Sequence, residues 1–175
     1  GMTLESFGMV ARLTTSDQKQ LAIINTVELS EGLLSELKAL ETETQSPIQT
    51  IFSPGDWHHR HLLSWATAFK DAKLYVASDR VLKKQPELKN INNGVVVLDR
   101  INPVVPELSQ EFDLVPFLGC HQPPWIFGGD KKGTDRVEHV VFHKSTRTLF
   151  ITDHVFAASK AGGPLPNNTG GFSIK

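Results

Sequence analysis

The sequence predicts a mixed α/β domain built in layers, and two observations lead to that prediction. Helical and strand patterns alternate in the first half of the chain, whereas strand patterns follow one another in the second half. The chain has 175 residues, 39% hydrophobic and 21% charged, which is typical of one soluble domain with a hydrophobic core. We expect that domain to span residues 1–160, followed by an irregular tail over residues 161–175.

The first half begins with two expected strands, MVARLTT and QLAIINTVEL, joined by the turn SDQK. Ser30 is placed to cap a helix over EGLLSELKALETE, in which the leucines recur at helical spacing. Pro47 follows this helix and precedes IQTIFS, whose nearly continuous apolar run predicts a strand covered on both faces. A second helix is expected over LLSWATAFKDA, with Trp65 on its buried face, and a strand over KLYVAS.

The second half contains mostly strands. LKKQPELKN is expected to be a polar connection with at most a helical turn, and GVVVLD and FDLVPFLG are expected strands. HQPPWIFGGDKKGTD predicts a loop because it contains Pro-Pro and Gly-Gly. VEHVVFHK and TLFITDHVF predict a hairpin, in which strand alternation means that His139 and Val140 cannot both point into the core.

Charge and composition exclude several classes of partner. The net charge of -1 offers no basic surface for nucleic acid, and no apolar run approaches the roughly 20 residues of a membrane span. Cys120 is the only cysteine, so no intrachain disulfide is possible, and we expect a reducing, cytoplasmic compartment. We therefore expect neither a nucleic-acid partner nor a membrane.

The stretch SPGDWHHRHLLSW concentrates residues that can bind metal. Asp56, His58, His59 and His61 follow an expected strand directly, at the edge where α/β sheets usually place their sites. Imidazole and carboxylate are the ligands that divalent transition metals prefer. The alternative is that Asp56 caps the following helix and that the histidines lie on different faces of its first turn.

A second candidate position lies near the C-terminus, where the expected strand TLFITD ends on Asp153. A carboxylate directly after a buried strand is costly unless it is paired, hydrogen-bonded or bound to metal. The alternative is a helix cap for VFAASKA.

These stretches, in this order, resemble the metallo-β-lactamase fold, and more closely a poorly characterised branch of that superfamily, a domain of unknown function. The resemblance covers residues 8–160 and implies a four-layer αββα sandwich, here abbreviated at its C-terminal end. SPGDWHH aligns with the superfamily pattern Thr-His-x-His-x-Asp-His, where only His59 is identical; Asp56 and His58 are changed but still able to bind metal, and Pro54 is not.

The resemblance also places Asp153, in LFITD, at the superfamily's bridging aspartate. His121, in GCHQPP, aligns with a further ligand histidine, and Glu138 and His139 compete for that role. The final ligand histidine of the superfamily has no counterpart.

The resemblance implies one Zn or Fe ion per chain, held by Asp56, His58, His59, His121 and Asp153. The implied function is a metal-dependent hydrolase acting on an ester, lactone, thioester or amide. The alternative is a non-catalytic protein of the same fold that binds a small molecule or a protein partner. Trp57, His61 and Trp125 would form the wall of the substrate pocket. The alternative for Trp57 and Trp125 is that each packs on its own loop.

Overall fold

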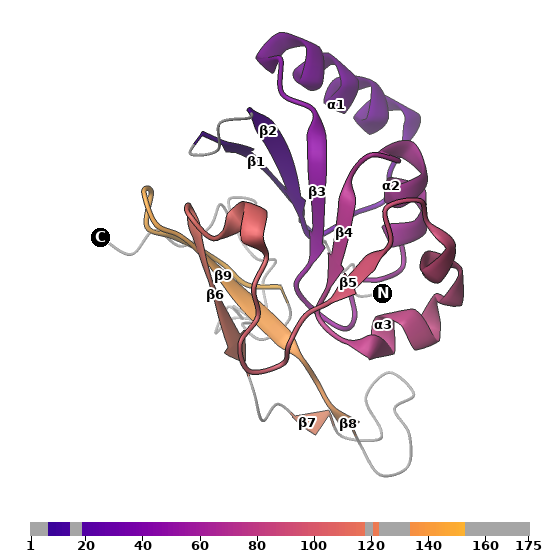
Figure 1. Cartoon of the computed structure of the whole chain (residues 1–175), viewed down its shortest axis with the longest axis vertical. Helices are drawn as coiled ribbons and strands as arrows, with labels where there is room; N and C mark the ends of the chain where they lie inside the picture. Colours follow the sequence, from indigo (N-terminus) through magenta and orange to yellow (C-terminus); the bar gives the residue numbers. More distant parts are fainter. Residues whose placement is uncertain (1–6, 15–18, 118–120, 123–133, 153–175) are drawn as a thin grey trace, which may run out of the picture.

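A computed structural model describes residues 7–14, 19–117, 121–122 and 134–152, with side chains described outside 121–122 and 134–135 (Figure 1). The fold is mixed α/β, as predicted. The predicted tail over residues 161–175 lies outside these ranges, as do Trp125 and Asp153. None of the helices in the described ranges is both long and apolar enough to cross a membrane.

A five-stranded sheet forms the centre of the described structure. Its strands lie in sequence order, and β2 to β5 are parallel, whereas β1 is antiparallel to β2. The N-terminal hairpin and the strand IQTIFS are thus confirmed. The strands are β1 (Met9–Leu13), β2 (Gln20–Ile24), β3 (Ile48–Ser53), β4 (Lys73–Val76) and β5 (Val95–Val97).

The helices lie together beside this sheet (Figure 1). Ser30 caps the first of them as predicted, because its hydroxyl accepts a hydrogen bond from the backbone N–H of Leu33 at 3.2 Å. The sequence missed α3, whose N-cap is Ser78. The helical segments are α1 (Glu31–Thr44), α2 (Leu62–Ala68), α3 (Asp79–Lys84) and two 3₁₀ turns, η1 (Pro86–Asn90) and η2 (Pro106–Leu108).

A second sheet contains three antiparallel strands in the order β10-β9-β6. The predicted hairpin is β9–β10, and Arg147, the last residue of its turn before β10, has a left-handed φ of 54°. The predicted loop over residues 121–135 lies between β6 and β9. Its first two and last two residues pair as the short strands β7 and β8. These strands are β6 (Phe112–Phe117), β7 (His121–Gln122), β8 (Thr134–Asp135), β9 (Glu138–His143) and β10 (Thr148–Phe150).

Two apolar clusters separate three layers. Leu21 and Ile23 of β2 face the helices, where they pack in one cluster with Trp65 of α2. Ala22 and Ile24 of the same strand face the three-stranded sheet, in the second cluster. Because successive side chains of β2 point to opposite faces of the sheet, both faces of this strand are buried, as expected for a parallel strand between two layers.

The two sheets also meet through backbone hydrogen bonds just beyond β3. Gly55 forms an isolated antiparallel bridge with Glu138, and the N–H of His139 donates to the carbonyl oxygen of Pro54 at 2.8 Å. His139 and Val140 are both buried, because both faces of β9 are covered at this point. The turn after β3 is thus attached to a strand more than 80 residues later in the chain.

Candidate functional site

The turn over residues 54–61 lies at the carboxyl edge of the parallel strands. β2, β3 and β4 all end at this edge, where open α/β sheets place their ligand sites. Ser53, the last residue of β3, holds the turn from inside, because its hydroxyl donates to the carbonyl oxygen of His58 at 3.0 Å. The side chains of the turn therefore start from a fixed backbone.

Asp56 is buried, with 2% of its surface exposed, and both of its carboxylate oxygens accept hydrogen bonds. Oδ1 accepts from the hydroxyl of Ser78, and Oδ2 accepts from the backbone N–H of Val137 at 3.1 Å. These contacts offset the cost of burying the charge. The alternative that Asp56 caps the following helix is wrong, because the N-cap of α2 is His61, which makes no side-chain cap bond.

His59 is fixed by the same turn. Its Nδ1 lies 3.0 Å from the carbonyl oxygen of Asp56, and because a carbonyl only accepts, Nδ1 must carry the hydrogen. Nε2 then has a lone pair, as a metal ligand or a base requires. Burial, with the nearby charges of Lys84 and Arg60, lowers the pKa of His59, although the contact with Asp56 opposes the shift. The imidazole is therefore neutral near pH 7.

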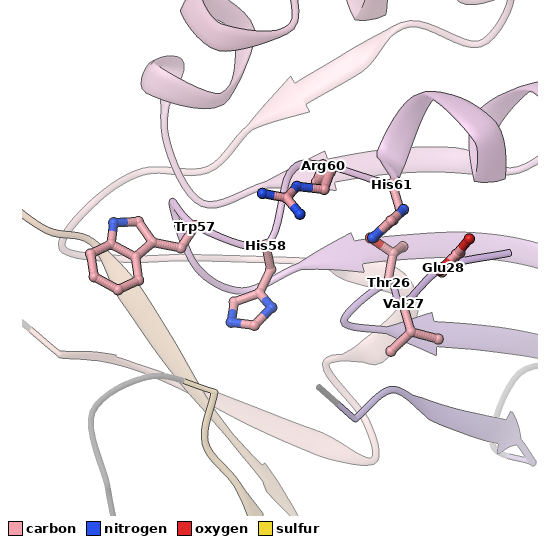
Figure 2. Close-up of a pocket in the computed structure, with 7 residues that line it drawn as sticks. All are labelled: Thr26, Val27, Glu28, Trp57, His58, Arg60 and His61. Carbon is pink, nitrogen blue, oxygen red and sulfur yellow. The ribbon is translucent and has the colours of Figure 1, made fainter. Parts of the chain in front are cut away.

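A pocket of about 410 Å³ lies beside this turn (Figure 2). Its size is within the usual range for small-molecule sites. Two of the three residues predicted to wall a pocket, Trp57 and His61, line it. The full lining is Thr26, Val27, Glu28, Trp57, His58, Arg60 and His61.

Trp57 also contacts the segment that leads into β9. The guanidinium carbon of Arg136 lies 4.8 Å from the centroid of the Trp57 ring, a cation–π geometry. Trp57 therefore packs beyond its own loop. Trp125, the third predicted wall residue, lies outside the described residues.

His139 is a buried histidine to which the sequence assigned only an alternative ligand role. It is 0% exposed, its ring stacks on Phe52 at a centroid distance of 6.4 Å, and neither ring nitrogen has a hydrogen-bond partner among the described residues. Burial lowers its pKa to about 4, against the opposing charge of Asp99. We find no structural partner that explains this imidazole.

The predicted metal ligands are only partly placed. No group of three His, Cys, Asp or Glu side chains that could hold an ion occurs within the described ranges. Asp56 already uses both oxygens, whereas the His121 side chain and Asp153 lie outside those ranges. The ligand set stays a prediction.

The sequence missed Thr26, Glu28 and Arg60 as pocket residues. Arg60 lies within SPGDWHHRHLLSW, the stretch already considered as a site, and its positive charge could have marked it as a ligand-binding residue. Thr26 and Glu28 follow β2, and only the pairing of β2 with β3 brings them to the turn. Comparison with known proteins gives no assignment, since no family model, curated protein or solved structure matches this chain.

Proposed function

We propose that this protein is a metal-dependent hydrolase-like protein of the metallo-β-lactamase type, with its site at the carboxyl edge of the five-stranded sheet. Its substrate is a small molecule with an ester, lactone, thioester or amide bond. The four-layer αββα sandwich and a cytoplasmic location belong to this proposal. The three described layers, helices, sheet and sheet, support the first three layers of that sandwich.

The main support is a series of contacts that links the turn after β3 to the segment after β10. Gly55 bridges Glu138, whose Oε1 accepts hydrogen bonds from the Thr152 backbone N–H, at 2.5 Å, and from the Thr152 hydroxyl. Thr152 directly precedes Asp153 in the sequence. The resemblance requires these two chain segments to supply ligands to one ion, and their described parts are connected through one residue, Glu138, by its backbone on one side and its carboxylate on the other.

The donor types fit the proposed ion, although the described residues alone do not complete the site. His59 has the tautomer that leaves Nε2 available, and His58 precedes it in the same turn. Asp153 and His121 would add the remaining donors, while Asp56 would position the turn. When bound, Zn or Fe would polarise the scissile carbonyl and lower the pKa of water.

The second candidate is a non-catalytic protein that binds a small molecule in the same pocket. The specific observation in its favour is that both oxygens of Asp56 are already used by Ser78 and Val137. Without this carboxylate, only His58 and His59 remain as predicted donors among the side chains that the structure describes, fewer than the three protein ligands typical of a catalytic zinc ion. The pocket is independent of that loss.

Metal analysis of protein purified without a His-tag separates the two candidates. We expect about one transition-metal ion per chain in the wild type, and its loss in His59→Ala and in Asp153→Ala. His143→Gln is the control, because His143 hydrogen-bonds within the β9–β10 turn.

Activity is then measured on esters, lactones, thioesters and amides. Metal together with turnover that both site variants lose supports the hydrolase. Metal without turnover on any of these substrates favours the binding protein. Absence of metal after growth with added zinc or iron contradicts the metal-dependent proposal.

A further inference from the structure

We propose that the pocket beside the turn binds a small anion, a carboxylate or a phosphate ester, through Arg60, His61 and Thr26. This inference rests on the proposed function, because it names the class of molecule that the same site accepts. It depends on three donor groups that line one cavity and have no side-chain hydrogen-bond partner among the residues that the structure describes.

Arg60 supplies the charge. Its side chain lines the pocket, and the guanidinium forms no hydrogen bond or ion pair with any residue of the described ranges. Its backbone carbonyl is held by the Nε2 of Gln85 at 3.0 Å, so the start of the side chain is fixed. A guanidinium presents a planar pair of N–H donors that matches a carboxylate or a phosphate.

His61 and Thr26 supply further donors from two segments of the chain. His61 stands at the start of α2 and lines the pocket, and within the described structure its ring makes no hydrogen bond. Thr26, just after β2, is 3% exposed, and its hydroxyl has no hydrogen-bond partner in the described part of the protein. A buried hydroxyl without a partner costs free energy, and a ligand oxygen would remove that cost.

The local charges agree with an anionic ligand. Lys84 and Arg60 both act on His59 with positive charge, and the Asp56 carboxylate in the same turn is bonded to Ser78 and Val137. Glu28, an acidic residue of the pocket lining, lies on the same side as His61 in the view of Figure 2, with Arg60 between it and Trp57. Trp57, on the other side, offers an aromatic wall for an apolar part of the ligand.

Titration of the protein with phenyl phosphate, benzoate and neutral benzamide, followed by two-dimensional NMR, tests this inference. The Trp57 indole N–H signal reports on the pocket and is assigned with Trp57→Phe. We expect saturable shifts with either anion and none with benzamide. Arg60→Gln is expected to weaken anion binding by about tenfold or more, since it removes a charge-assisted pair.

Two further variants make the result specific. Arg12→Gln removes an exposed arginine from β1, paired with Leu21 at the other end of β2, and is expected to leave binding unchanged. Thr26→Val is expected to weaken anion binding several-fold while the melting temperature stays equal or rises, because the hydroxyl has no partner among the described residues.

Equal shifts with benzamide and benzoate, or equal affinity in Arg60→Gln and wild type, overturn the anion inference. A lower melting temperature in Thr26→Val overturns the assignment of that hydroxyl to the ligand. These measurements involve no bond cleavage and no metal. Turnover of neutral esters without anion binding would therefore refute this inference alone, and anion binding without metal or turnover would refute the hydrolase alone.

Discussion

Asp56→Ala separates a structural role for this carboxylate from a role as a metal ligand. The substitution leaves two donors inside the protein without their acceptor, the hydroxyl of Ser78 and the N–H of Val137. Hydrogen bonds to charged acceptors contribute about 1.5–3 kcal/mol each, so we expect the free energy of unfolding to fall by about 3–6 kcal/mol. Ser78→Ala, which removes one of the two donors, is expected to cost about 1–3 kcal/mol.

The assay is urea unfolding followed by circular dichroism, on protein treated with a chelator. Asp79→Ala is the matched control, because Asp79 is exposed and only pairs with Lys83 on the same helix. If Asp56 acts through the fold, its substitution destabilises the metal-free protein, and the double variant Asp56→Ala/Ser78→Ala costs less than the sum of the two single changes. A loss below about 1 kcal/mol in the metal-free protein would refute the structural account.

Three further predictions concern stability. The pKa of His139 is lowered to about 4, so the contribution of this residue to stability should fall by about 3 kcal/mol between pH 7 and pH 4. His139→Leu should abolish that loss without destabilising the protein at pH 7. Burial and the hydrogen bond to Glu107 raise the pKa of Tyr75, so stability should fall as the pH rises above about 10. Tyr75→Phe should remove this dependence and lower stability at pH 7 by about 1–2 kcal/mol. Ser30→Ala should lower stability by about 1 kcal/mol in urea unfolding, and a loss similar to that of Ser64→Ala on the exposed face of α2 would contradict the cap assignment.

Elements with a local signal were predictable from the sequence. Ser30 caps α1 through a bond that spans three residues, and the apolar run of IQTIFS is enough to define a buried strand. The six residues of α3 give too short a pattern to detect, and its cap, Ser78, has a hydroxyl that also bonds Asp56. Short elements fixed by tertiary contacts have little signal in sequence spacing.

The composition of the site depended on contacts that no local pattern contains. Asp56 bonds Val137, a residue 81 positions away, and this contact decides whether its oxygens are available. Thr26 reaches the pocket only because β2 pairs with β3 across the α1 connection. The sequence could therefore predict that the candidate residues gather at the end of β3, where the pocket lies, but not which side chains of the turn line that pocket.

The geometry of the turn favours a separation between the two proposed functions, metal binding and anion binding. The backbone of Asp56 orients the His59 ring, while Arg60 and His61, the next two residues, line the pocket. Since the Asp56 carboxylate holds the turn against β9 and the end of β4, a change there should disturb metal binding and anion binding together. By contrast, His59→Ala should remove only the metal, and Arg60→Gln should weaken only the anion. If His59→Ala and Arg60→Gln each abolished both activities without unfolding the protein, the turn would form one indivisible site and this separation would be wrong.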